Sequence, residues 1–325
     1  MVSASSPPPV YSGNCPPERR KYVLIAAILA SAMGFIDGSV VAIAVPKMRA
    51  SLDASFVQIQ WVTASYYLFM AAPMLVAGAA GDRYGIKRTF GIGIGLFILA
   101  SVLCALAPSA ETLIAFRCLQ GLGASIMVPG SMAIISRNYP RDVRGVALGT
   151  WVAASSITTV SGPFVGGILL TQGSIEAWRL IFAINLPLGG LALLLLWLKV
   201  PTDEPRERVP MDLRGAVLAS LAMGSLALGL SLAGEQGQIT NGALAIGLGL
   251  GMLVITIRWW LSTAHPMIDL DLFRSKAFAG ANVMTFAVWA GLGAVLFYLP
   301  MVLVTGWSMN ELEAAATLLP FGLTI

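Results

Sequence analysis

GAAGDRYGIKRTF, residues 78–90, is a short polar segment between two long apolar runs, and it decides how the chain must fold. The apolar runs cover residues 56–80 and 89–107, and each is long enough to cross a lipid bilayer as a helix. The cations of the segment are Arg83, Lys87 and Arg88. Because three cations are costly to move across a membrane, the segment is predicted to be a cytoplasmic turn between two spans.

The composition of the whole chain indicates the same class of protein. Hydrophobic residues make up 57% of the 325 residues and charged residues 11%, which is not the composition of an ordinary soluble domain. Apolar runs of about 20 to 25 residues match the hydrocarbon core at about 1.5 Å of rise per helical residue. Transmembrane strands would give alternating segments of about 10 residues, which the sequence lacks. The fold class predicted is an all-α, multi-pass membrane protein.

The apolar runs predict nine complete spans and the beginning of a tenth. The predicted spans cover residues 22–46, 56–80, 89–107, 111–135, 143–170, 179–198, 215–233, 241–261 and 277–304, and the tenth begins near Leu312. The last run ends at Ile325 after about 14 residues, too few to cross a bilayer. We therefore expect either a fragment or a truncated chain.

The distribution of Lys and Arg predicts the orientation. With a cytoplasmic N-terminus, sixteen of the twenty cations fall in inside segments, three fall in outside segments, and Arg117 lies within a span. Cytoplasmic loops carry such an excess, so a multi-pass protein of the cytoplasmic (inner) cell membrane is predicted. This sorting by side of the membrane also argues against a nucleic-acid partner. Residues 1–20 are rich in proline and serine and predict a disordered cytoplasmic tail, not a signal peptide.

Two charged residues inside apolar runs are candidate functional residues, because a charge in the bilayer must be compensated. Asp37 in the first span and Arg117 in the fourth are predicted to lie at depths of roughly 13 Å and 9 Å below the outer helix ends. The two helices can thus bring an acid and a base together, where the carboxylate exchanges a proton for a cation. A static ion pair, or an arginine that extends to the surface, is the alternative.

Other residues indicate helix packing and a cavity. The fifth span contains a set of small residues and a proline that favours close helix packing with a kink: Gly149, Gly162, Pro163, Gly166 and Gly167. Aromatic residues that are candidates to line a substrate cavity are Trp61, Tyr66, Tyr67, Trp151 and Trp289. Signatures of metalloproteases, nucleotide-binding loops and serine hydrolases are missing from the sequence, as is any ligand cluster for a metal, so neither an enzyme nor a metal site is predicted.

These stretches together resemble the major facilitator superfamily, and in particular its fourteen-span drug/proton antiporter branch. Residues 78–90 resemble the signature loop between spans two and three, although Ile86 replaces a usual cation. LIAFRCLQGLGAS, residues 113–125, resembles the fourth-span signature, and the fifth span resembles the antiporter signature. IDGSVVAIAVP (36–46), WRLIFAINLPLGG (178–190) and LEAAATLLPFG (312–322) are also similar to this branch. In such proteins the loop latches the cytoplasmic ends of the two halves; its residues here are Gly78, Asp82, Arg83, Gly85, Lys87 and Arg88.

The resemblance implies a major-facilitator-type helical bundle. It predicts a six-helix half over residues 21–200, a charged connection with two linker helices over 201–265, and the start of a C-terminal half over 266–325. It also implies a proton-coupled efflux antiporter for hydrophobic or cationic small molecules, driven by the proton gradient without a cofactor, with Asp37 as proton carrier and Arg117 as its partner. The alternatives are a proton-linked metabolite transporter and a truncated membrane partner that transports nothing. The oligomeric state is not predicted.

Overall fold

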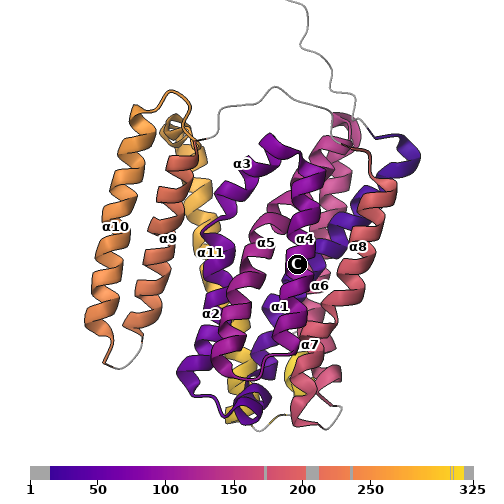
Figure 1. The fold of residues 1–325 in the computed structure, drawn as a ribbon, viewed down its shortest axis with the longest axis vertical. Coiled ribbons are helices and arrows are strands. Elements are labelled where there is room, and N and C mark those ends of the chain that lie inside the picture. The colour runs from indigo at the N-terminus through magenta and orange to yellow at the C-terminus, as the bar shows by residue number, and fades with distance from the viewer. Residues whose placement is uncertain are drawn as a thin grey trace, which may run out of the picture.

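The computed structural model describes residues 15–171, 174–202, 212–234, 237–307, 309 and 311–317, and in these residues all regular structure is helical (Figure 1). The first part of the chain contributes α1 (Pro17–Leu52), α2 (Phe56–Ala71), α3 (Met74–Tyr84), α4 (Ile86–Ala105), α5 (Ala110–Asn138) and α6 (Arg141–Leu170). The next part contributes the 3₁₀ turn η1 (Ile175–Trp178), α7 (Arg179–Ala183), α8 (Asn185–Lys199), α9 (Leu213–Ala233) and α10 (Ile239–Ser262). The remainder holds η2 (Leu270–Arg274), α11 (Lys276–Gly306) and α12 (Glu311–Ala316).

The number of predicted spans is confirmed. Among the described residues, eight helical segments are long and apolar enough to cross a membrane, and a bent pair within α2 and α3 makes a ninth. The two parts of that pair meet at 46°. Pro73 separates α2 from α3, and a proline inside a span removes a backbone hydrogen bond and bends the helix. The all-α membrane fold predicted from composition is therefore the observed one.

Two details differ from the prediction, and two predicted segments lie largely outside the described residues. The helix α1 begins at Pro17, because a proline fits the first turn of a helix, so the predicted disordered tail is wrong for Pro17–Arg20. The rest of that tail, to residue 14, lies outside the described residues. The sixth span is divided into η1, α7 and α8. The described part of the tenth span is only α12, and most of the charged connection, residues 203–211, is likewise outside the described residues.

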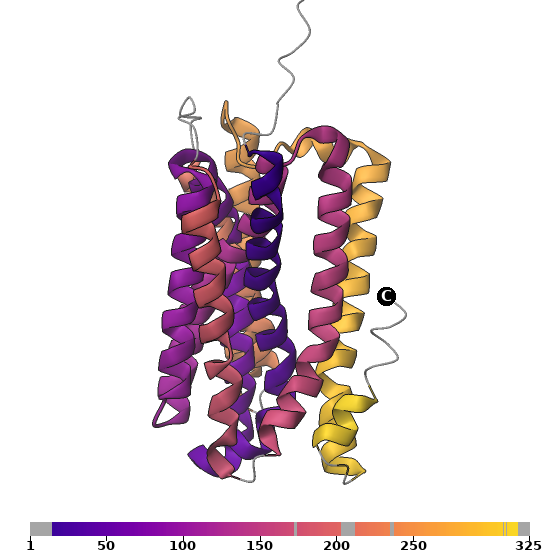
Figure 2. The same cartoon turned by 90° about the vertical axis from the view of Figure 1, so that its right-hand side faces the viewer.

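The helices α9 and α10 form a hairpin beside the main bundle (Figure 1). They pack mainly on each other, and α9 also packs on α2 and α3. The Ser220 hydroxyl donates to the carbonyl oxygen of Ala72, next to the break at Pro73. At the face of the bundle on the right of Figure 2, α11 packs on α1, and α12 packs on α6. The predicted linker hairpin is thus attached to the bent second span.

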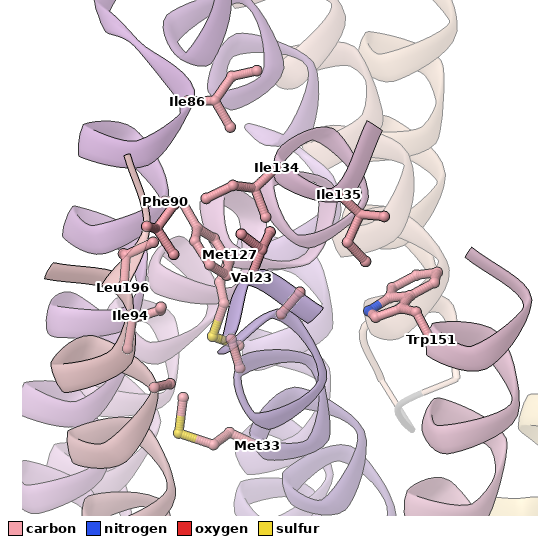
Figure 3. Close-up of a cluster of buried hydrophobic side chains, with 14 of the residues drawn as sticks. Val23, Met33, Ile86, Phe90, Ile94, Met127, Ile134, Ile135, Trp151 and Leu196 are labelled. Carbon is pink, nitrogen blue, oxygen red and sulfur yellow. The ribbon is translucent and has the colours of Figure 1, made fainter. Parts of the chain in front are cut away.

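Two apolar clusters fill the bundle at different depths. The first cluster includes Val23 and Met33 of α1 with residues of α4, α5, α6 and α8 (Figure 3). The second includes Val40 and Met48 of α1 with residues of α2, α5 and α7. Because Met33 and Val40 belong to different clusters, the segment of α1 between them lies where the two clusters meet. Asp37 is in that segment.

The contact between α1 and α6 depends on two of the predicted packing glycines. A Cβ atom at Gly162 would clash with the Ser39 hydroxyl and lie 3.2 Å from the Ile36 Cα atom. A Cβ atom at Gly166 would clash with the Val40 side chain. Pro163 and Gly167 are buried in the same segment, whereas Gly149 has open space around it. The motif therefore packs on α1 through its C-terminal part alone.

Alanine substitutions test this packing. Gly162→Ala and Gly166→Ala are each expected to lower the free energy of unfolding by about 1–3 kcal/mol, because the added methyl group overpacks the interface with α1. Gly149→Ala is the matched control and should not lower stability, since nothing lies within 4 Å of its Cβ position. The measurement is thermal unfolding of the detergent-purified protein. Equal midpoints for the three variants would contradict the packing described.

Candidate functional site

The two charges predicted to approach one another form an ion pair. Asp37 of α1 and Arg117 of α5 are both fully buried, and Arg117 Nη1 donates to Asp37 Oδ2. Arg117 Nε donates to the carbonyl oxygen of Val62 in α2 at 3.0 Å. Arg117 therefore does not extend to the surface, and the pair joins three helices.

Three uncharged polar side chains complete the site. Gln120, one helical turn after Arg117, accepts from Arg117 Nη1 at 2.7 Å and donates from Nε2 to Asp37 Oδ1 and to Ser101 Oγ, both at 2.9 Å. Asn185 Nδ2 donates to Ser101 Oγ at 3.2 Å and lies 3.5 Å from Asp37 Oδ1. A buried charge is stable only when its hydrogen-bonding capacity is satisfied, and these groups supply that for the carboxylate.

Sequence reasoning did not identify Gln120, Ser101 or Asn185. Each is a polar residue inside an apolar run, and the same signal identified Asp37. Neutral polar side chains are common in such runs, however, so the sequence alone does not single out these three. Two polar atoms of the site, Arg117 Nη2 and Asn185 Oδ1, are buried without a hydrogen-bond partner in the part of the chain that the structure describes. Among the described residues, the hydrogen bonding of the site is therefore complete for the carboxylate but not for Arg117 and Asn185.

Aromatic rings enclose the guanidinium group. The Tyr66 ring centroid lies 4.2 Å from Arg117 Cζ, and the Phe182 centroid lies 5.7 Å from it. Both distances are within the range of cation–π attraction. Tyr66 reaches this position because α2 and α5 lie very close: a Cβ atom at Gly121 would be 2.5 Å from the Tyr66 carbonyl oxygen. Glycine at residue 121 is thus required for the contact.

A cavity of about 550 Å³ lies on the other side of Tyr66. Its lining comes from α1, α2, α5, α6 and α11, and includes Tyr66, Tyr67 and Trp289 from the predicted set. We call it the central cavity. Tyr66 thus faces both the ion pair and the central cavity, and its hydroxyl donates to the Gly34 carbonyl oxygen at 3.4 Å. Asp37 and Arg117 themselves are not among the described residues that line the cavity.

The other two predicted aromatic residues lie elsewhere. Trp151 belongs to the first apolar cluster, where its indole nitrogen donates to Ser31 Oγ at 2.9 Å (Figure 3). Trp61 lines a different pocket, between α2 and α9. Trp151 and Trp61 therefore do not line the central cavity, because helical rotation and not aromatic character decides which face a residue occupies.

Within the polar segment over residues 78–90, two helices are separated by a single residue. Gly85 has a φ of 97° and separates α3 from α4, a conformation that favours glycine. Lys87 is buried, its Nζ donates to the Val200 carbonyl oxygen at 2.6 Å, and it lies over the Trp197 ring. Gly78 has open space around it, and the exposed side chains of the segment are Asp82, Arg83, Tyr84 and Arg88. Lys87 therefore binds the end of α8 within the same half.

The family of the chain follows from comparison with known proteins. Residues 27–325 match the Major Facilitator Superfamily, and the chain belongs to this family. It is 34% identical over 306 residues to the tetracenomycin C resistance and export protein of Streptomyces glaucescens, covering 91% of this chain and 55% of that protein. It is 31% identical over 326 residues to the multidrug export protein EmrB of Haemophilus influenzae, covering 99% and 62%. The chain spans about half the length of the first curated relatives that it matches.

Solved structures show the same fold. A partially occluded, inward-open structure of the xylose transporter XylE from Escherichia coli has a TM-score of 0.59 and 16% identity, covering 92% of this chain and 70% of that one. An auto-inhibited peptide transporter of the POT family has a TM-score of 0.55 and 15% identity, covering 74% and 52%. Identities this low support the fold alone. Members of the superfamily are transporters, which agrees with the prediction that the chain is not an enzyme.

The geometry of Arg117 can be tested by a substitution that keeps its charge. Arg117→Lys is expected to lower the free energy of unfolding by about 2 kcal/mol, because an ammonium group cannot serve Asp37, Gln120 and the Val62 carbonyl in the planar arrangement of a guanidinium group. Arg274→Lys is the control, since Arg274 pairs with Asp271 on an exposed surface. Thermal unfolding in detergent measures both. A midpoint unchanged by Arg117→Lys would show that the network contributes little.

Proposed function

We propose that the protein to which this chain belongs exports hydrophobic or cationic small molecules across the cytoplasmic membrane in exchange for protons, with its N-terminus in the cytoplasm. The observation that carries the proposal is the buried Asp37–Arg117 pair beside an apolar cavity. Relatives named as drug-resistance and export proteins support the substrate class. No cofactor is required, because the proton gradient supplies the energy.

Asp37 is the proton carrier in this proposal and Arg117 its partner. Protonation of the carboxyl group removes the negative charge that holds Arg117 Nη1, and the guanidinium group then depends on Gln120, Val62 and the Tyr66 ring. The two protonation states thus favour different positions of Arg117 and of Tyr66. Because Tyr66 also lines the central cavity, protonation alters the wall of the substrate site. A ligand or a proton shifts a conformational equilibrium only through such differences in contact.

The central cavity supports a hydrophobic substrate. Among the described residues that line it, none is Asp, Glu, Lys or Arg, and the polar groups are hydroxyls such as those of Ser39, Thr63 and Thr159. Its volume of about 550 Å³ is within the usual range for pockets that hold drug-sized molecules. A sugar or an amino acid would need several hydrogen-bonding partners in a buried site. The lining thus favours export of apolar compounds over transport of a polar metabolite.

Transport itself is proposed to follow alternating access, in which two halves of the protein open a central site to either side of the membrane. The central cavity fits this scheme, because its described lining combines residues of α1, α2, α5 and α6 with residues of α11, which belongs to the predicted start of the C-terminal half. As a latch between the halves, the segment over residues 78–90 would act at the cytoplasmic ends through Asp82, Arg83 and Arg88, which are exposed and therefore accessible to a partner surface.

Asp37→Asn tests the proposal. In everted membrane vesicles containing the full-length protein, proton-driven ethidium export by Asp37→Asn is expected to fall at least about tenfold, equivalent to about 1.4 kcal/mol, because asparagine cannot bind and release a proton. Asp271→Asn is the matched control, since the Asp271 carboxylate is 71% exposed on η2 and should be dispensable. Proton-driven export that persists undiminished in Asp37→Asn would refute the assignment of the proton carrier.

A further inference from the structure

A second apolar pocket lies between α2 and the linker helix α9. Its volume is about 460 Å³, and its lining includes Trp61 and Ala64 of α2 with Met223, Ala227 and Leu230 of α9. Met223, Ala227 and Leu230 are exposed, although α9 otherwise packs on α2 and α3. We call this space the lateral pocket, because α9, which lines it, belongs to the hairpin of α9 and α10 at the side of the bundle (Figure 1).

Tyr67 connects the lateral pocket with the central cavity. It is the residue common to the described linings of both. Its side chain remains 43% exposed, and its hydroxyl donates to the Gly38 carbonyl oxygen of α1 at 3.1 Å. A Cβ atom at Gly38 would lie 2.8 Å from that hydroxyl, so the glycine leaves the space that the Tyr67 side chain occupies. The aromatic side chain therefore forms part of the wall of both spaces, and its hydroxyl binds α1.

We propose that the lateral pocket is a binding site for lipophilic small molecules that arrive through the bilayer, and that Tyr67 is the partition they pass to reach the central cavity. This rests on the export function proposed above and adds the route of entry. It also assigns a role to the linker helix α9, which supplies one wall of the pocket.

Two observations favour a small molecule as the occupant. The pocket shares Tyr67 as a wall residue with the central cavity, so its occupant has a second internal space next to it, whereas a lipid chain needs only a groove open along its length. Its lining offers aromatic and small apolar side chains, Trp61 and Ala64 among them, which suits a compact apolar or aromatic compound. Tyr67 also packs edge-on against Tyr66 with ring centroids 5.3 Å apart, so an occupant that moved Tyr67 would press on the residue that encloses Arg117.

Photolabelling tests occupancy of the lateral pocket. The full-length protein in phosphatidylethanolamine vesicles is labelled with trifluoromethyl-phenyl-diazirine, with and without excess N-phenylnaphthylamine, and the labelled peptides are mapped. Saturable labelling that N-phenylnaphthylamine suppresses is expected in α2 near Ala64 and in α9 near Ala227. Labelling of Leu244 and Leu248, exposed residues of α10, should not saturate. Non-saturable labelling of the lateral pocket as well would show that lipid alone fills it and would overturn the proposal.

Substitutions that fill the pocket test its specificity. Ala227→Phe is expected to reduce the saturable labelling about tenfold, since the larger ring occupies the space of the ligand. Ala64→Phe closes the same pocket from α2 and serves if Ala227→Phe does not fold. Ala243→Phe is the matched control, because Ala243 is exposed on α10 and lines neither space. Equal loss of labelling in Ala243→Phe would overturn the assignment.

Export measurements separate this inference from the proposed function. Ala227→Phe and Ala64→Phe should each lower proton-driven export of N-phenylnaphthylamine severalfold. Labelling needs no proton gradient, so wild-type protein that labels but does not export would contradict the proposed function and leave the pocket supported. Conversely, undiminished export by variants that no longer label would refute the route through Tyr67 and leave proton-driven export intact.

Discussion

A buried ion pair inside a membrane bundle is the constraint on which the rest of this structure depends. Taking the charges of Asp37 and Arg117 out of water is costly, and close pairing with hydrogen bonds from neighbouring helices compensates that cost. The groups that compensate it come from several helices, since Val62 is on α2, Ser101 on α4, Gln120 on α5 and Asn185 on α8. These helices must therefore converge at one depth, and the bundle is organised around that point.

The packing of the bundle also supports the position of the ion pair. One apolar cluster lies to each side of Asp37 along α1, so apolar packing flanks the pair in both directions. Glycines supply the close approach that the geometry needs: Gly121 brings α5 to the Tyr66 backbone, and Gly162 and Gly166 bring α6 to α1. Small residues at helix contacts are a usual solution in membranes, where dispersion forces replace the hydrophobic effect as the source of packing energy.

The helix α2 connects the charged site with both apolar spaces. Two adjacent residues make these connections. Tyr66 stacks on Arg117 and lines the central cavity, and Tyr67 lines both the central cavity and the lateral pocket. Both hydroxyls bind carbonyl oxygens of α1, at Gly34 and Gly38, so a movement of α1 against α2 would change both contacts. The break at Pro73 lies just beyond this region and gives α2 a direction that differs by 46° from that of α3.

The sequence by itself determined the number of spans and the approach of Asp37 to Arg117. Apolar runs must match the thickness of a bilayer, and two charges in such runs need each other, so both conclusions follow from solvation energy and spacing along the chain. The tertiary structure alone decided the partners of the pair, including Asn185, and the division of the predicted aromatic residues among the central cavity, the lateral pocket and the first apolar cluster. It also decided that Lys87 binds the end of α8. These outcomes depend on how each helix rotates about its axis and on which neighbour it meets, and composition and spacing do not encode either.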